Sequence, residues 1–220
     1  MDKKIIIRKV VFEIIGIILL ALGVTGIIVT ELGASSLDAF NVFFGKLVKI
    51  ETGTATLITN AVIAVILFAL TRNFKLVFSI VVGILIGLCI NFWQPLLNNI
   101  FNIGDANSIM NHYWFSIPFG LVSIVIVAIG AAILIIEKLP MSSYDELTLY
   151  LSKKIGSYHK TKVLLDTFFL ILAIILGLIT KLLTTQINFF TIIVVIGVGP
   201  TINFILRIYE KRKEKKNAIE

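Results

Sequence analysis

The chain has few of the residues on which metal and disulfide chemistry depend, with one cysteine and two histidines among 220 residues. Cys89 has no second cysteine with which to form an intramolecular disulfide. The sequence also lacks a Cys-x-x-Cys pair and a histidine-rich cluster, which are the ligand patterns of common zinc and iron–sulfur sites. We therefore expect no metal site and no cofactor.

Sequence motifs of the common enzyme classes are also missing. The chain lacks the His-Glu-x-x-His of zinc proteases, the Gly-x-x-x-x-Gly-Lys loop of nucleotide-binding proteins and the Gly-x-Ser-x-Gly of serine hydrolases. No nucleophile, base and acid form a recognisable set in the sequence. We expect no enzymatic activity, and an intramembrane enzyme is the least favoured function.

Charge is scarce as well, because only 15% of the residues are charged whereas 58% are hydrophobic. The mean hydropathy is +1.01, and a soluble domain of this size could not bury so large an apolar fraction. Several apolar runs reach the length of about 20 residues that a membrane-spanning helix needs. We predict an all-α fold, a polytopic membrane helical bundle. The expected transmembrane helices are the six segments 10–31, 53–71, 74–95, 114–137, 162–182 and 187–208.

The net charge of +7 is concentrated between the apolar runs and in the tail. With the N-terminus in the cytoplasm, every one of the 20 Lys and Arg residues except Lys46, Lys49 and Lys181 falls on the inner side, as the positive-inside rule requires. Loop 96–112 contains no Lys or Arg. This distribution favours membrane topology over nucleic-acid binding as the reason for the charge. It places both termini in the cytoplasm, and we expect the first apolar run to be a retained helix.

Two polar stretches repeat each other at a distance of 107 residues. ELGASSLDAF begins at Glu31 and KLPMSSYDEL at Lys138, so that both carry Ser-Ser-x-Asp at equivalent positions. Near the ends of the two halves, GLCINF at Gly87 matches GPTINF at Gly199. An odd number of spans per copy makes the second copy enter the bilayer from the opposite side, so we predict two inverted three-helix repeats. The expected division is 1–103 for the first repeat, 104–112 for an outer loop, 113–208 for the second repeat and 209–220 for a basic cytoplasmic tail.

Each Ser-x-x-Asp matches a helix capping box, in which the serine hydroxyl accepts from the amide three residues on and the carboxylate reaches back to the cap amide. About 15 residues of amphipathic pattern follow each box and would reach only about 22 Å, which is too short to span a bilayer. We therefore predict an amphipathic or re-entrant helix in each repeat. Capping alone is one interpretation. Contact with a substrate is the other, because broken helices present such groups to a cavity in transporters.

Further polar residues lie inside the expected spans. Glu13 and Asp166 are candidates for proton coupling, and the alternative is an interfacial carboxylate paired with Lys9 or Lys162. Asn91 and Asn203 are candidates for substrate binding, and the alternative is hydrogen bonding between helices. The candidate substrate-binding or gating residues are Ser35, Ser36, Asp38, Ser142, Ser143, Asp145, Asn91 and Asn203.

The order of these motifs resembles the YczE/YyaS/YitT family of bacterial integral membrane proteins. The resemblance is carried by LGASSLDAF, ETGTATLITN and SIVVGILIGLCINF in the first half, and by LPMSSYDEL, KVLLDTFF and TIIVVIGVGPTINF in the second. Family members usually have Ser-Pro-Trp-Asp and Gly-Pro-Arg-Asp where this chain has Ser35-Ser36-Leu37-Asp38 and Ser142-Ser143-Tyr144-Asp145, so the chain is similar to a divergent member. The resemblance implies a bacterial plasma membrane protein with a transporter-like role.

Two functions follow from these features. The first is a small secondary transporter or permease for an unidentified small solute, working by alternating access of the two repeats. The alternative is a non-transporting regulatory or scaffolding subunit that binds another membrane protein, which would suit the small size, the few buried charges and the basic tail. The expected partners are the lipid bilayer, a small solute and a second copy of the chain as a candidate homodimer, with no nucleic acid.

Overall fold

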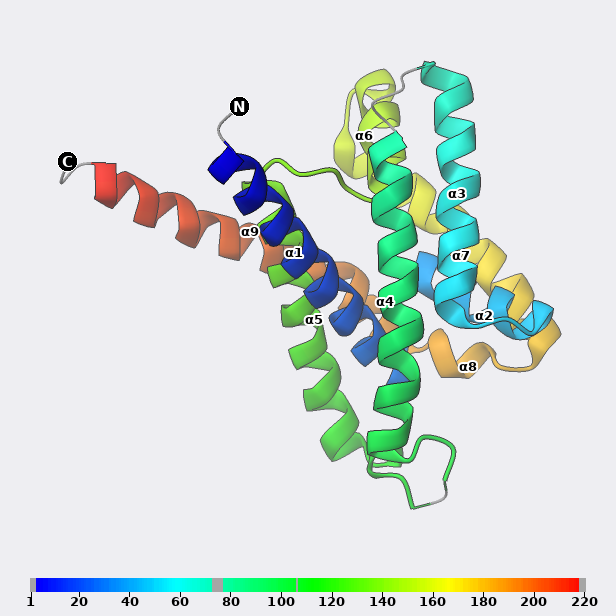
Figure 1. Ribbon diagram of the computed structural model, residues 1–220. Coiled ribbons are helices and arrows are strands. Elements are labelled where there is room, and N and C mark those ends of the chain that lie inside the picture. The colour runs from blue at the N-terminus through cyan, green and yellow to red at the C-terminus, as the bar shows by residue number, and fades with distance from the viewer. Residues whose placement is uncertain (1–2, 73–76, 106, 218–220) are drawn as a thin grey trace.

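The computed structural model describes residues 3–72, 77–105 and 107–217 (Figure 1). The expected start of the third span at residue 74 and the last residues of the basic tail lie outside these ranges. Within them the chain is helical. The helices are α1 (Lys3–Val29), α2 (Ser36–Val48), α3 (Thr52–Thr71), α4 (Val77–Phe101), α5 (Tyr113–Ile136), α6 (Ser143–Ile155), α7 (Tyr158–Thr180), α8 (Leu183–Gln186) and α9 (Phe189–Asn217), with a short 3-10 helix η2 (Ile109–Asn111) before α5.

Six helices of the described residues, α1, α3, α4, α5, α7 and α9, are long and apolar enough to cross a membrane. The chain is therefore a multi-pass integral membrane protein, as the hydropathy predicts. The two expected short helices are also present, because α2 and α6 have 13 residues each and lie between spans.

The predicted ends of the third and sixth spans come too early in the sequence. The third span was expected to end at residue 95, but α4 continues through Pro95 to Phe101. Proline removes one backbone hydrogen bond, and flanking apolar turns can carry a membrane helix past it. The sixth span was expected to end at residue 208, but α9 continues as helix into the basic tail as far as Asn217.

The centre of the bundle is an antiparallel contact between α1 and α5 (Figure 1). A Cβ atom built on Gly23 would lie 2.6 Å from the backbone nitrogen of Val127, and one on Gly130 would lie 2.6 Å from that of Leu20. Lipid tails are as apolar as the side chains, so helices in a membrane associate mainly through close van der Waals contact. These glycines allow the two backbones to approach, and both glycines are buried.

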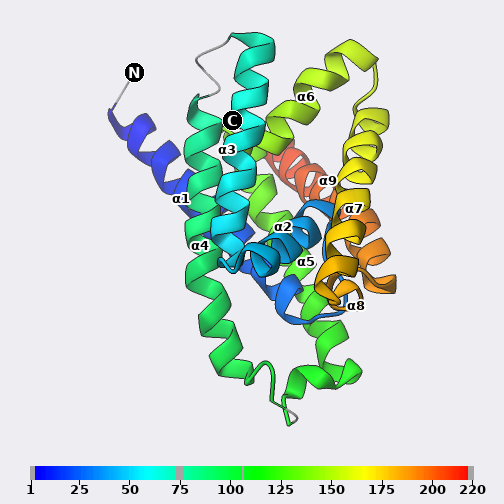
Figure 2. The same cartoon turned by 90° about the vertical axis from the view of Figure 1, so that its right-hand side faces the viewer.

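Some of the remaining helices pack directly on this pair and others pack on those (Figure 2). Helix α4 contacts both α1 and α3, and α9 contacts α5. At the α3–α4 contact, a Cβ on Gly87 would lie 2.5 Å from the carbonyl oxygen of Gly53. Helix α7 contacts both short helices, α2 and α6. An ion pair of 2.6 Å between Arg8 and Glu137 joins the start of α1 to the end of α5.

Replacing Gly23 by alanine should destabilise the protein, because the added methyl group has no room between the α1 and α5 backbones. The expected loss is about 1–3 kcal/mol, as for overpacking of a tight core. Thermal unfolding in detergent measures it. Gly197→Ala is the matched control, since a Cβ there would meet only Ile124, at 3.9 Å. Equal melting temperatures for the two variants would contradict the role assigned to Gly23.

Candidate functional site

The two Ser-Ser-x-Asp stretches form the N-termini of α2 and α6 with the same local geometry. The amide of Asp38 donates to the Ser35 hydroxyl at 3.2 Å, and the amide of Asp145 donates to the Ser142 hydroxyl at 3.3 Å. These contacts confirm the predicted serine caps. They leave each aspartate side chain in the first turn, where a negative charge favours the positive end of the helix.

The two carboxylates do not make the predicted contact with the backbone amide of the cap residue. Instead of reaching a backbone amide, Asp38 Oδ2 accepts from the Ser35 hydroxyl at 2.6 Å, and Asp145 Oδ2 accepts from the Ser142 hydroxyl at 2.7 Å. The serine hydroxyl thus accepts from the helix amide and donates to the carboxylate. Each carboxylate is held by a short contact within its own turn and keeps further acceptor capacity.

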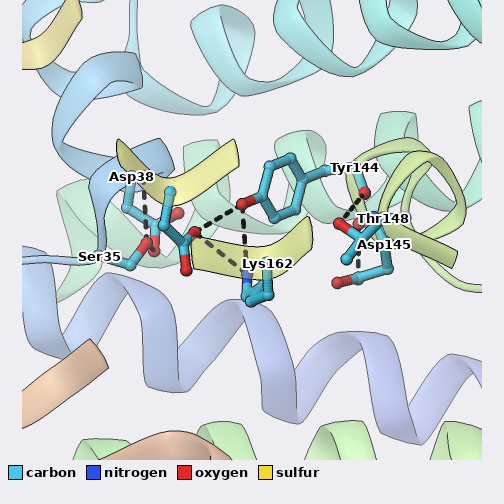
Figure 3. Close-up of polar contacts among 8 residues, drawn as sticks. Ser35, Asp38, Tyr144, Asp145, Thr148 and Lys162 are labelled. Atoms are coloured by element: carbon cyan, nitrogen blue, oxygen red, sulfur yellow. Dashed lines mark hydrogen bonds and ion pairs between the residues drawn. The ribbon is translucent and has the colours of Figure 1, made fainter. Parts of the chain in front are cut away.

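A second polar group joins α6 to α7. The Tyr144 hydroxyl donates to Asp166 Oδ1 at 2.5 Å, and Lys162 Nζ donates to the Tyr144 hydroxyl at 3.3 Å. Lys162 also pairs with Asp166 at 3.3 Å, which agrees with the interpretation of Asp166 as a paired carboxylate. The ammonium lies 4.4 Å from the centre of the Tyr144 ring, where the π-face attracts a cation. Figure 3 shows these contacts between the two capped turns.

An aromatic contact brings the two capped helices onto the same part of α7. The Phe169 ring lies edge to face with Phe40 of α2 at 5.5 Å and with Tyr144 of α6 at 5.6 Å. Phe169 is buried, and it lies one turn from Asp166 on α7. Segments that are 107 residues apart in the sequence therefore meet at one junction of α2, α6 and α7. We call this set of polar residues, Ser35, Asp38, Ser142, Tyr144, Asp145, Lys162 and Asp166, the acidic junction.

The acidic junction contains more carboxylates than cations. Burial raises the pKa of Asp38 above its ordinary value, and the Ser35 hydrogen bond opposes this shift. Lys162 also lowers the pKa of Asp38, whereas the charges of Asp166 and Asp145 raise it. The carboxyl group of Asp38 therefore favours a proton more than a solvated aspartate does. Burial and Asp166 raise the pKa of Tyr144, so that its hydroxyl stays a donor at neutral pH.

Asn41 is a buried residue that the sequence analysis missed. It lies one turn after Asp38 on α2, it is 1% exposed, and neither its amide nitrogen nor its amide oxygen has a hydrogen-bond partner in the described structure. A buried unpaired amide is costly, so it marks a place where water or a ligand group is needed. The available signal was an amide within an otherwise apolar helical stripe.

The other predicted site residues lie elsewhere or have structural contacts. Ser36 and Ser143 are buried, and the Ser143 hydroxyl lies 3.4 Å from that of Ser79 on α4. Glu13 is half-buried on α1, and among the described residues no hydrogen bond or ion pair joins it to the acidic junction.

Asn91 and Asn203 are not partners in this site. The Asn91 amide nitrogen donates to the Thr54 hydroxyl at 2.8 Å and its oxygen accepts from the Thr54 amide at 3.2 Å, as the alternative of hydrogen bonding between helices predicts. Asn203 is exposed on α9.

A cavity of about 570 Å³ lies away from the acidic junction, at the end of the bundle that carries the α4–α5 loop. Thr30 and Glu31 line it from the end of α1, Asp105 and Asn111 from the loop, and Asn188 from the segment after α8. The cavity is polar and open.

Comparison with known proteins finds a family of unknown function and a relative in Bacillus subtilis. The sequence profile described as "Family of unknown function (DUF6198)" matches residues 7–207. The chain is also 28% identical over 170 residues to "Uncharacterized protein YyaS" of Bacillus subtilis (strain 168), an alignment that covers 76% of this chain and 80% of that protein. The similarity to YyaS agrees with the resemblance found in the motifs. No solved protein structure matches the chain.

Asp38→Asn should change how stability depends on pH. Because folding raises the pKa of Asp38, the folded protein keeps a proton there at pH values where the unfolded chain has lost it. This stabilisation is complete below the unfolded-state pKa of about 4 and is lost as pH rises through the folded-state pKa. We expect the melting temperature of the wild type to fall over this window more than that of Asp38→Asn. Parallel curves, or the same change for the exposed control Asp105→Asn, would contradict the shift.

Proposed function

The chain belongs to the DUF6198 family of unknown function, and from that premise we propose that it is a small secondary transporter for an unidentified small solute. The two halves are inverted repeats, and the acidic junction between them is the site that alternates between the two sides of the membrane. The observation that carries the proposal is that α2 and α6, the equivalent helices that carry Asp38 and Asp145, both pack against Phe169 of α7.

Equivalent contacts across α1 and α5 support the inverted repeat. A shift of 107 residues converts Gly23 and Val127 into Gly130 and Leu20. A Cβ atom built on either glycine would lie at the same distance, 2.6 Å, from the backbone nitrogen of its partner. The two helices are antiparallel, so an axis relating them lies perpendicular to both, which is the relation expected of inverted repeats. The matching ends of α2 and α6 give further support. Ser35 caps the start of α2 and Ser142 caps the start of α6. At the other end, α2 stops at Lys49 and α6 at Gly156, and both of these residues have positive φ.

The chemistry of the acidic junction favours a positively charged partner, either a proton or a cationic group of the solute. The acidic junction contains three carboxylates and one ammonium group, and that ammonium group, on Lys162, is already paired with Asp166. Protonation of Asp38 removes a negative charge next to Asp145 and Asp166, and it changes the bond with the Ser35 hydroxyl. Each serine hydroxyl can turn from its carboxylate to a bound solute, so that proton and solute binding are linked at the same capped turn.

The proposed setting is a bacterial plasma membrane with both termini in the cytoplasm. The loop between α4 and α5 then lies outside, and the polar cavity beside it is an outer vestibule. An even number of spans leaves both ends of the chain on one side of the membrane, and the start of α1 and the end of α9 lie toward the same end of the bundle in Figures 1 and 2. The positive-inside distribution supports this direction.

Cysteine labelling tests the inverted topology. In a Cys89→Ser background, Lys49→Cys and Gly156→Cys place single thiols at the equivalent exposed ends of α2 and α6. A membrane-impermeant maleimide should label position 49 in intact cells and position 156 only after permeabilisation. Labelling of both positions from the same side would exclude the inverted repeat and with it alternating access.

Transport itself is tested with purified protein in proteoliposomes on a solid-supported membrane. A panel of small cationic, zwitterionic and neutral solutes is applied, and we expect at least one class to evoke a charge-translocation current. Asp38→Asn and Asp145→Asn should lower this current to the level of empty liposomes, because asparagine keeps an acceptor for the serine hydroxyl but cannot titrate. The control Lys46→Gln alters an exposed residue of α2.

Two results would contradict the proposal. The first is a panel in which no solute evokes a current with the wild type. The second is a current that persists in folded, monodisperse Asp38→Asn and Asp145→Asn proteins, since the carboxylates would then serve only as helix caps.

A further inference from the structure

The outer face of α9 has features that are unusual for a surface exposed to lipid. Ile192 and Ile196 are 62% and 65% exposed, and Gly199 and Asn203 on the same face are exposed too. A Cβ on Gly199 would meet nothing within 4 Å, and Asn203 has no hydrogen-bond partner among the described residues. Residue 203 lies within the apolar span of α9, where an unpaired amide is costly.

The same pattern on α4 shows how this chain uses such a face. Gly87 and Asn91 have the same spacing as Gly199 and Asn203, and they pack against α3. Gly87 allows the α3 backbone to approach at Gly53, while Asn91 exchanges two hydrogen bonds with Thr54. On α4, a glycine followed four residues later by an asparagine thus forms a face that packs against another helix. On α9, no helix of the described structure packs against the face with the same spacing.

Helix α7 of the same chain is a poor partner for this face. The residues of α7 equivalent to Gly53 and Thr54 are Lys160 and Thr161. A side chain at the Gly53 position would clash with the Gly87 backbone, so Lys160 blocks a copy of the α3–α4 contact. Thr161 is 0% exposed, so its hydroxyl is not accessible to α9, and it donates to the carbonyl oxygen of Ser157.

We propose that the α9 face docks on the α9 face of a second copy of this chain, forming a two-fold homodimer. Ile192, Ile196, Gly199 and Asn203 are separated by four, three and four residues, which is the spacing of a seam between parallel helices. Two copies inserted in the same direction are related by an axis along the membrane normal, and their α9 helices then run parallel.

The face is complementary to itself, which favours a second copy over a different protein. The Asn203 amide is both donor and acceptor, so the two Asn203 side chains satisfy each other across the axis. Gly199 allows the close approach that this hydrogen bond requires. The contact does not depend on the proposed transport activity, because it involves none of the residues of the acidic junction.

Disulfide cross-linking in native membranes tests the dimer. In full-length Cys89→Ser protein, Ile196→Cys should form a covalent dimer on oxidation, because residue 196 faces its own copy across the axis. Phe204→Cys is the matched control, since it is 64% exposed and points away from the seam. Adding Asn203→Val to Ile196→Cys should lower the cross-linked fraction by roughly fivefold or more, as expected for loss of an interhelical hydrogen bond.

Each outcome decides the proposal. Cross-linking of Ile196→Cys but not Phe204→Cys, reduced by Asn203→Val, supports it. Equal cross-linking of the two cysteine variants, or an undiminished dimer with Asn203→Val, would overturn it, as would a monomer by mass photometry of the unmodified protein in lipid nanodiscs. A hetero-complex through α9 would leave Ile196→Cys without the symmetric disulfide and would also overturn it.

Discussion

The packing of α1 against α5 is the contact on which the rest of the bundle depends. In lipid, helices gain little from the hydrophobic effect, so the energy that holds them together comes from close contact and from hydrogen bonds within the membrane. Gly23 and Gly130 allow that contact at the centre, and α4 and α9 then pack on its two flanks. The short helix α2 follows the C-terminal end of α1, and α6 follows the C-terminal end of α5. Both short helices pack against α7.

The acidic junction combines local hydrogen bonds within single turns with tertiary contacts between helices. The capped turns of α2 and α6 are local, because each depends on four consecutive residues. The tyrosine–aspartate–lysine group is tertiary, because it requires α6 and α7 to pack in one register. Local caps fix the carboxylates in direction, and tertiary packing raises the pKa of Asp38 by removing water from it.

Local signals explain which parts of this architecture were predictable. Apolar length predicts the six spans, and Ser-x-x-Asp predicts the starts of α2 and α6 within one residue. The contact of Tyr144 with Asp166 was not predictable, because a tyrosine in an amphipathic stripe gives no sign of the helix that its hydroxyl meets. The burial of Asn41 was hidden for the same reason. Helix ends at Pro95 and in the basic tail were misplaced, since proline and charge weaken a helix without ending it.

The position of Phe169 has a mechanical consequence. One ring is in contact with the first short helix on one side and with the second on the other. Because the ring is close-packed, it cannot move with one of the two helices without either clashing with the other or losing contact with it. The two short helices are therefore coupled by steric contact through this ring. A movement of the helix that carries one carboxylate would change the packing of the helix that carries the other, with no need for a long-range electrostatic effect.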